Sequence, residues 1–230
     1  MTSANSHFAL SRSELARLID QTLLKPEATP EDIKSLCRQA KQYGFATVCI
    51  NPCYVEIARN ELINSLTSVC TVIGFPLGAS ASTVKAAEAA AAVRAGAAEI
   101  DVVMNIGYFK GGFLNNVLDD LNGVIKAARQ VKQNTVVKVI LETCLLNDRE
   151  KFEACRLAVT AGANFVKTST GWDKGGATVA DVALLKQATG SGVKVKASGG
   201  IRNTATALAM IEAGASRLGT SSGIAILDKV

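Results

Sequence analysis

Eight short apolar runs, separated by longer segments of helical pattern, constrain the fold of this chain more than any other feature. Strands that alternate with helices along a chain predict a parallel sheet. Eight such units with short connections in 230 residues fit a closed (β/α)8 barrel, the TIM barrel, built as one domain over residues 1–230. We expect strands at residues 18–24, 47–50, 69–73, 99–103 and 136–141, around Lys167, at 193–197 and from 217 onward.

An open, doubly wound sheet is the alternative architecture. Dinucleotide-binding folds of that type carry a GxGxxG turn after the first strand, and this chain has none there. The closed barrel is therefore the favoured prediction.

Capping residues mark the expected helix boundaries. Thr29 precedes Pro30 and Asp32, an arrangement typical of a helix N-terminus, and Gly44 ends that helix. Asn147 begins a later helix, with Glu150 three positions on. The other helices that we expect span residues 11–17 (a short N-terminal helix), 55–66, 82–95 and 113–131.

The triplet Ala-Gly-Ala occurs three times, each time between an expected helix and the strand after it. Glycine adopts the left-handed conformation that ends a helix, and small neighbours allow a helix to pack closely on a sheet. The triplets at residues 95–97, 161–163 and 213–215 are therefore predicted helix stops.

Composition limits the classes of protein to be considered. No apolar run is long enough to span a bilayer, and the N-terminus lacks the basic start and apolar centre of a signal peptide, so we expect a cytoplasmic protein. The formal net charge of +5 is carried by dispersed lysines and arginines, without a basic cluster that alternates with aromatics. This charge fits an anionic substrate, and we expect neither a nucleic-acid nor a membrane partner.

Histidine and cysteine usage argues against a metal centre. His7 is the single histidine and lies in the expected N-terminal tail, which leaves little basis for a histidine-ligated metal. The cysteines form no CxxC pair and lie mostly in apolar stretches, so we expect free, packed thiols. They are Cys37, Cys49, Cys53, Cys70, Cys144 and Cys155.

Two lysines occupy matching places on neighbouring strands. Lys167 is the last apolar-flanked residue of the sixth expected strand, and Lys196 holds the matching place on the seventh, each followed by small or hydroxyl residues. A surface lysine at a strand end is the simpler explanation for either one alone. Two ammonium groups about 5 Å apart repel by roughly 3 kcal/mol at an effective dielectric constant of about 20, which equals about two pKa units. We therefore expect a nucleophilic amine at Lys167, whose pKa is lowered by the cation of Lys196, as Schiff-base chemistry requires.

Asp101 lies within an apolar strand, where a charged side chain requires a partner. It could move protons to and from a carbinolamine and an imine, or form a structural ion pair with an interior lysine. Alternation places Lys194 on the face of Lys196, and Lys138 on the face of Glu142. We expect Lys194 and Lys138 in lower barrel layers, each in a salt bridge.

Glycine-rich turns follow the last two expected strands. Gly199-Gly200 comes after the seventh and Gly219-Thr220-Ser221-Ser222 after the eighth, with Arg202 beyond the first turn. Loops at these places, ahead of a short helix, commonly hold a phosphate group in barrels of this type, because backbone N–H groups can approach its oxygens. The sequence therefore predicts an anion site.

Five segments in order resemble deoxyribose-phosphate aldolase: residues 20–24, 99–103, 165–171, 196–200 and 219–222. The similarity extends from about residue 15 to residue 222. The resemblance implies a class I aldolase that reversibly cleaves 2-deoxy-D-ribose 5-phosphate to glyceraldehyde 3-phosphate and acetaldehyde. It also implies that no metal or other cofactor is used and that the chain forms a homodimer.

Residue roles follow from the resemblance by position. Lys167 is similar to the Schiff-base lysine, Lys196 to the second lysine, and Asp101 to the proton donor and acceptor. Asp20, Thr22 and Thr170 correspond to substrate-pocket or proton-relay residues, and Cys49 to a pocket cysteine that can react with aldehydes, although a packed thiol explains it equally well. Residues at phosphate-binding places are Gly171, Gly199, Gly200, Arg202, Gly219, Ser221 and Ser222.

Two positions depart from patterns found in some family members. Trp172 replaces a lysine, so one phosphate contact is missing, and the chain ends at Val230 rather than at a tyrosine that assists proton transfer. We therefore expect slower protonation of the acetaldehyde enamine, or a water molecule in the place of the tyrosine. A different Schiff-base aldolase, a sugar-phosphate isomerase and a non-catalytic sugar-phosphate sensor remain the alternative functions.

Overall fold

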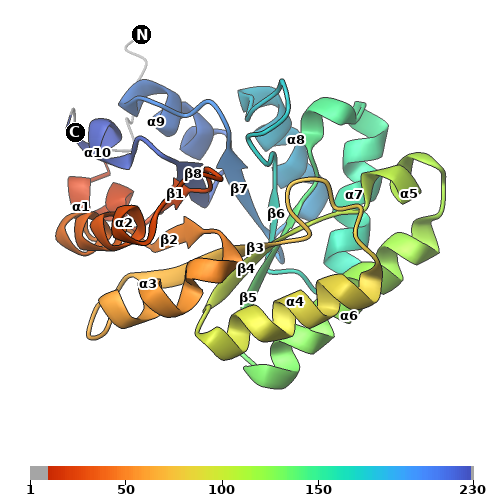
Figure 1. Ribbon diagram of the computed structural model, residues 1–230. Helices are drawn as coiled ribbons and strands as arrows, with labels where there is room; N and C mark the ends of the chain where they lie inside the picture. Colours follow the sequence, from red (N-terminus) through yellow and green to blue (C-terminus); the bar gives the residue numbers. More distant parts are fainter. Residues whose placement is uncertain (1–9, 229–230) are drawn as a thin grey trace, which may run out of the picture.

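The computed structural model describes residues 10–228 and contains a closed barrel of eight parallel strands (Figure 1). His7 and Val230 lie outside the described residues. Each strand pairs with its neighbours in sequence, and β1 pairs with β8 to close the barrel, which confirms the predicted fold. The strands are β1 (Ile19–Leu23), β2 (Thr47–Ile50), β3 (Ser68–Ile73), β4 (Glu99–Val103), β5 (Val136–Ile140), β6 (Phe165–Lys167), β7 (Lys194–Ser198) and β8 (Arg217–Thr220).

Helices surround the barrel, and at least one follows every strand (Figure 1). They are α1 (Arg12–Ala16), α2 (Pro30–Tyr43), α3 (Val55–Glu61), α4 (Ser82–Ala95), α5 (Ile106–Lys110), α6 (Leu114–Val131), α7 (Asp148–Thr160), α8 (Val179–Thr189), α9 (Thr204–Glu212) and α10 (Gly223–Leu227). Two 3-10 turns, Pro52–Tyr54 and Thr143–Leu145, follow β2 and β5.

Two helix predictions need correction. The helix expected over residues 55–66 ends at Glu61, and Asn64 has φ 60°, a left-handed conformation that no right-handed helix can contain. The short helix α5 was not predicted, although Asn105 caps it by accepting a hydrogen bond from the Tyr108 N–H at 3.0 Å.

The predicted capping signals are confirmed. Thr29 with Asp32, and Asn147 with Glu150, each form reciprocal side-chain and backbone hydrogen bonds at the start of α2 and α7. The glycines of the three Ala-Gly-Ala triplets have φ 120°, 83° and 110°, in the region that favours glycine, and each directly precedes the turn into a strand.

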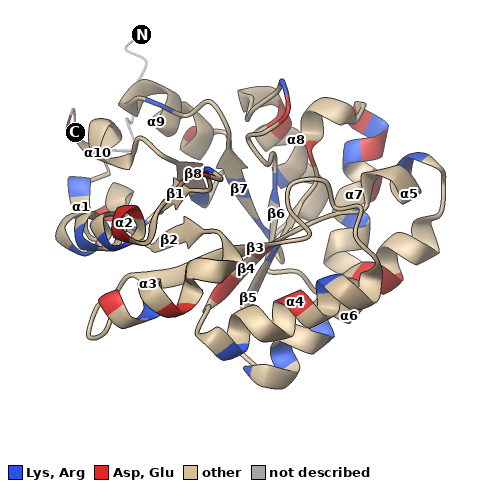
Figure 2. Cartoon of the chain, in the orientation of Figure 1, with Lys and Arg blue, Asp and Glu red and all other residues tan. Residues whose placement is uncertain are grey.

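The hydrophobic core lies between the barrel and the helices. In β4, Ile100 and Val102 pack into this layer, and Val137 and Val139 of β5 do the same. Strand alternation therefore turns Glu99 and Asp101 into the barrel. Charged residues accordingly occupy the barrel centre as well as the outer helices (Figure 2). The barrel interior is thus the polar part of the molecule.

The strand register places the predicted site residues in two neighbouring rows of the sheet. Lys167 pairs with Lys196 across β6 and β7, and Asp101 pairs with Lys138 across β4 and β5. None of the helices within residues 10–228 is long and apolar enough to cross a membrane.

Candidate active site

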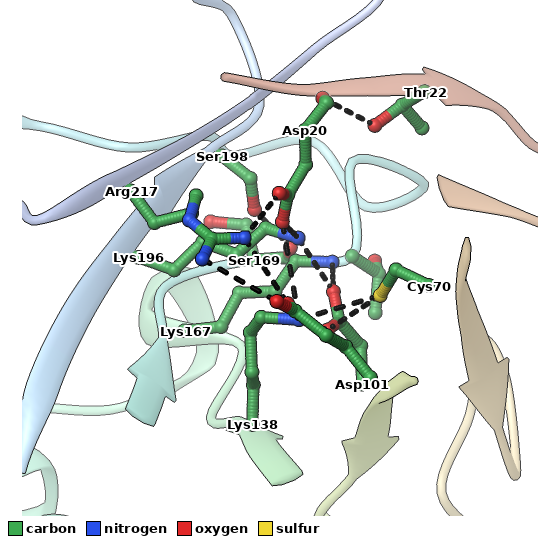
Figure 3. Close-up of polar contacts among 12 residues, drawn as sticks. Asp20, Thr22, Cys70, Asp101, Lys138, Lys167, Ser169, Lys196, Ser198 and Arg217 are labelled. Carbon is green, nitrogen blue, oxygen red and sulfur yellow. Dashed lines mark hydrogen bonds and ion pairs between the residues drawn. The ribbon is translucent and has the colours of Figure 1, made fainter. Parts of the chain in front are cut away.

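Lys167, Lys196 and Asp101 meet inside the barrel (Figure 3). Lys167 Nζ lies 2.9 Å and Lys196 Nζ 2.8 Å from the same oxygen, Asp101 Oδ2. The two nitrogens therefore cannot be farther apart than the sum of these distances. The lysines point to the same side of the sheet, as the alternation of β6 and β7 predicts.

A larger network of buried charges surrounds these three residues. Lys196 also pairs with Asp20 at 2.5 Å, and Arg217 binds Asp20 at 2.6 Å and Glu99 at 3.1 Å. Within the described chain, this network joins three carboxylates to four cations: Asp20, Glu99 and Asp101 with Lys138, Lys167, Lys196 and Arg217 (Figures 2 and 3).

The predictions for the two other lysines have different outcomes. Lys138 forms the expected salt bridges, 2.6 Å from Glu99 and 2.8 Å from Asp101 Oδ1, and is therefore a third cation at the Asp101 carboxylate. The salt bridge predicted for Lys194 is wrong. Lys194 begins β7, where it is exposed, and its Nζ lies 5.8 Å from the centre of the Phe165 ring. Because Lys194 is exposed at the start of its strand, water solvates its ammonium group, and no carboxylate partner is needed.

Electrostatics determine the charge states around Asp101. Burial alone would raise the pKa of Asp101, but the ammonium groups of Lys138, Lys167 and Lys196 hold it well below its ordinary value. Burial would also lower the pKa of Lys196, whereas Asp101 and Asp20 raise it above the ordinary lysine value. Asp101 is therefore ionised, and Lys196 is a fixed cation.

A cavity of about 330 Å³ opens above this network at the carboxyl ends of the strands. Lys167 lies at its floor, only 3% exposed. Eight other residues predicted for the site line the cavity: Thr22, Thr170, Gly171, Gly199, Gly200, Arg202, Gly219 and Ser221. The other predicted site residues do not line it: Asp20, Cys49, Asp101 and Lys196 are buried, and Ser222 precedes α10.

The phosphate-loop residues have the conformations that an anion site needs. Gly171, Gly199 and Gly200 have φ 85°, 89° and 78°, which only glycine adopts readily. A Cβ at Gly219 would lie 3.0 Å from Cε of Lys196, so glycine leaves room for that lysine. Arg202 is exposed at the cavity and has no salt bridge to any residue between 10 and 228.

Glu142 is a buried carboxylate that the sequence analysis did not assign to the site. It follows β5, is 3% exposed, and has φ 55°, a strained conformation for a residue with a side chain. Its carboxylate accepts hydrogen bonds from the Thr170 N–H at 3.2 Å and from the Thr170 hydroxyl. Thr170 Oγ1 in turn accepts a hydrogen bond from the Trp172 N–H at 3.1 Å. Glu142 therefore orients the loop that follows Lys167.

An aromatic pair lies at the rim of the cavity. Trp172 is 54% exposed, and its ring packs edge-to-face against Phe75, with the ring centres 6.3 Å apart. The residue that replaces a family lysine thus adds an apolar wall beside the glycine loops.

The expectation of packed cysteines is correct in part. Cys37, Cys49, Cys70 and Cys155 are buried, whereas Cys53 and Cys144 are exposed. Cys49, Cys70 and Asp101 place their sulfur and oxygen atoms within 4.8 Å of one another. Lysine ammonium groups already contact both oxygens of Asp101, so these residues do not form a free ligand set for a cation.

Comparisons with known proteins agree with this geometry. Residues 15–229 match the family described as DeoC/LacD family aldolase. A protein from Carboxydothermus hydrogenoformans named deoxyribose-phosphate aldolase is 55% identical, with 95% of this chain and 96% of that protein covered. A protein of the same name from Clostridium kluyveri is 54% identical, with 96% of this chain and 100% of that protein covered.

Solved structures show the same similarity. The structure described as "QR15, an Aldolase" has a TM-score of 0.89 at 41% identity and covers 94% of this chain and 95% of its own. The deoxyribose phosphate aldolase of Aeropyrum pernix, described as a unique tetramer, has a TM-score of 0.89 at 38% identity, with 95% of this chain and 92% of that chain covered.

Proposed function

The chain belongs to the DeoC/LacD aldolase family, and from this premise we propose that it reversibly cleaves 2-deoxy-D-ribose 5-phosphate to glyceraldehyde 3-phosphate and acetaldehyde. Lys167 forms the Schiff base. The observation that carries the proposal is the shared contact of Lys167 and Lys196 with one buried carboxylate oxygen at the floor of the cavity.

The charge balance of the network supports Lys167 as the nucleophile. Lys138, Lys196 and Arg217 each have two or more carboxylate contacts, whereas Lys167 has a single one, with Asp101. Loss of one proton from Lys167 leaves three cations opposite three carboxylates, so no buried charge is left uncompensated. Lys167 is also the network lysine that lines the cavity, where a carbonyl group can reach it.

The reaction then proceeds through an imine. The neutral Lys167 amine attacks C1 of the open-chain sugar, and the carbinolamine loses water to give a protonated imine. Removal of the proton from the C3 hydroxyl breaks the C2–C3 bond, which releases glyceraldehyde 3-phosphate and leaves an enamine on Lys167. Protonation of the enamine at C2 and hydrolysis of the imine release acetaldehyde and the free amine.

Asp101 moves the protons in this scheme. Its Oδ2 lies 2.9 Å from Lys167 Nζ, within reach of the groups that form on that nitrogen. Lys196 lies 2.8 Å from the same oxygen and keeps the carboxylate ionised between proton transfers. Thr22 and Thr170 line the cavity and contact the sugar hydroxyls in this proposal.

The phosphate group binds at the glycine loops. Gly171, Gly199, Gly200 and Gly219 allow close approach of the backbone, and Arg202 supplies a cation that is not used by another residue of the described chain. Ser221 lines this end of the cavity. Asp20, Cys49 and Ser222 remain predicted site residues without direct access to the cavity.

Trapping with sodium borohydride tests the central step. Incubation with acetaldehyde and borohydride is expected to attach one two-carbon adduct to Lys167, located by peptide mass mapping, while exposed Lys194 remains unmodified. A coupled assay is expected to detect glyceraldehyde 3-phosphate from deoxyribose phosphate. Labelling confined to surface lysines would contradict the Schiff-base assignment.

The same assays separate the alternative functions. An isomerase would release no acetaldehyde, and a non-catalytic sensor would bind deoxyribose phosphate without turnover. We further propose that the chain acts in the cytoplasm and forms a homodimer, which sedimentation would distinguish from the tetramer described for the Aeropyrum pernix protein.

A further inference from the structure

Two buried thiols lie directly beside the catalytic carboxylate. Cys49 of β2 and Cys70 of β3 are partners in the strand register, and both are at most 1% exposed. Both sulfur atoms and a carboxylate oxygen of Asp101 lie within 4.8 Å of one another. The proposed reaction uses neither thiol to form or break a bond.

The two thiols differ in their surroundings. Cys70 Sγ donates to Asp101 Oδ1 at 3.3 Å and accepts a hydrogen bond from Lys138 Nζ, also at 3.3 Å (Figure 3). A hydrogen bond from Cys70 lowers the pKa of Cys49 against the opposing effect of burial, and the Lys196 cation acts in the same direction. Burial raises the pKa of Cys70 well above the ordinary value. Cys49 is therefore the more acidic thiol of the pair.

The backbone geometry permits a bond between them. Directly paired residues on neighbouring strands lie about 4.8 Å apart, within the range of roughly 4.4–6.8 Å between Cα atoms that disulfides span. Both side chains belong to the same small buried cluster with Leu24 and Val72. The register pairing and the proximity of the two sulfur atoms are therefore compatible with a disulfide between Cys49 and Cys70.

We propose that Cys49 and Cys70 are a site of reversible oxidative modification, at which a small hydroperoxide forms a disulfide that stops catalysis. The effect on turnover rests on the proposed function, whereas formation of the disulfide does not. Thr22, the register partner of Cys49, lines the cavity, so a molecule as small as hydrogen peroxide has only a short path to the thiols.

The chemistry balances in two steps. The Cys49 thiolate attacks one oxygen of the peroxide, the O–O bond breaks, hydroxide leaves, and Cys49 becomes a sulfenic acid. The Cys70 sulfur then attacks the Cys49 sulfur, the S–O bond breaks, and the hydroxide leaves as water with the Cys70 proton. The two sulfur atoms supply the two electrons that reduce the peroxide. A dithiol reductant reverses the reaction through a mixed disulfide.

Loss of catalysis follows from the position of Cys70. The disulfide removes the S–H group that donates to Asp101 Oδ1 and turns the Cys70 sulfur toward Cys49. Lys138 then loses its contact with Cys70 in its present position. Because Asp101 Oδ2 holds both Lys167 and Lys196, a shift of this carboxylate changes the geometry at the nucleophile.

Peroxide treatment of the full-length protein tests the proposal. The intact mass is expected to fall by two hydrogen atoms, peptide mapping is expected to find the Cys49–Cys70 linkage, and dithiothreitol is expected to restore both the mass and the turnover. A disulfide that leaves turnover unchanged would overturn the inhibitory effect. Oxidation of Cys49 to a sulfinic acid without a disulfide would contradict the proposal that Cys49 and Cys70 form a reversible disulfide.

Variants identify the cysteines involved. Cys70→Ser keeps a hydrogen-bond donor beside Asp101 and is expected to form no disulfide, so that Cys49 gains an oxygen atom as a sulfenic acid instead of the protein losing two hydrogen atoms. Cys49→Ser is expected to lose the disulfide as well, which keeps the test decisive if one variant fails to fold. The matched controls, Cys53→Ser and Cys144→Ser, replace exposed thiols and are expected to behave as the parent. Loss of the disulfide in either control would contradict the assignment.

The mass measurement separates this proposal from the proposed function. If the protein does not cleave deoxyribose phosphate, the intact mass and the peptide map still show whether Cys49 and Cys70 are joined. If cleavage is observed and the two thiols remain reduced in peroxide, only the modification site is wrong.

Discussion

Lys167 and Lys196 occupy equivalent places in the sheet, yet their carboxylate partners differ. Lys196 is held by Asp20 at 2.5 Å and by Asp101 at 2.8 Å, whereas Lys167 has Asp101 alone. The second carboxylate helps to raise the pKa of Lys196 and so keeps its charge in place. The chemical difference between the two amines is therefore produced by one residue from β1.

Replacement of Lys196 by leucine is expected to shift the pH dependence of kcat/KM toward alkaline pH. The variant removes a cation beside Lys167, so a proton on Lys167 becomes less costly, and a higher pH is needed to remove it. Repulsion between charges about 5 Å apart corresponds to a shift of about two pH units. Lys194→Leu removes an exposed lysine two positions earlier and is expected to leave the profile unchanged. An unchanged profile in Lys196→Leu would exclude this role for Lys196.

Glu142→Gln is expected to weaken substrate binding. Glutamine retains one acceptor but directs an N–H group toward the donors of Thr170, so the loop from Thr170 to Trp172 loses its fixed orientation. Misplacement of positioning groups by about 1 Å can cost up to about a hundredfold in rate. We expect an increase in KM that exceeds the loss in kcat, together with normal borohydride labelling of Lys167. Glu56→Gln, on the exposed face of α3, is the control.

Among the elements, helices α4 and α6 share a buried ion pair near the carboxyl end of β4. Lys85 Nζ lies 2.5 Å from Asp120 Oδ2 and donates to the Val103 carbonyl oxygen at 2.7 Å. Val103 ends β4, the strand that carries Asp101. The alanine-rich face of α4 allows the two helices to approach, and the ion pair links both to the end of this strand.

Asp120→Ala is expected to lower the free energy of unfolding by about 3–5 kcal/mol, because it leaves the Lys85 charge buried without a partner. The adjacent Asp119 is exposed on the same helix, so Asp119→Ala is a matched control with an expected change below about 0.5 kcal/mol. Urea unfolding measures both. Equal urea midpoints for the two variants would show that the Lys85–Asp120 ion pair contributes nothing to the free energy of unfolding.

At the scale of the whole molecule, the barrel has an ionic interior inside an apolar shell. Apolar packing lies between strands and helices, and the strand faces that meet inside carry the seven charged residues of the network. In the proposed mechanism this arrangement couples catalysis to stability, since Asp101 serves both.

Stability is expected to fall in acid. The pKa values of Asp20 and Asp101 are held below their ordinary values, against the effect of burial, by lysines that include Lys138 and Lys196. Below a pH of about 4 the unfolded chain binds protons on these groups that the folded chain does not. The free energy of unfolding then decreases by about 1.4 kcal/mol per pH unit for each carboxylate, until the pH reaches the folded pKa. Urea unfolding between neutral pH and pH 3 measures this slope, and a flat profile below about pH 4 would contradict it.

At alkaline pH the dependence of stability on pH is reversed: the free energy of unfolding is expected to fall as the pH rises. The pKa values of Lys138 and Lys196 are raised in the folded chain, so their contribution to stability is complete below the unfolded value of about 10.4. It decreases as the pH rises through the folded pKa values.

The sequence by itself determined the barrel, most helix boundaries and the shared level of Lys167 and Lys196. These features depend on hydrogen bonds and side-chain alternation among residues close in the chain, so patterns such as Thr29 with Asp32 reveal them. Tertiary structure alone decided that Lys138 contacts Asp101, that Glu142 supports Thr170 and that Cys49 lies beside Cys70. It also decided against the salt bridge expected for Lys194. Each of these contacts joins neighbouring strands or the loops that follow them, and each depends on the register between those strands, which the residue pattern does not specify.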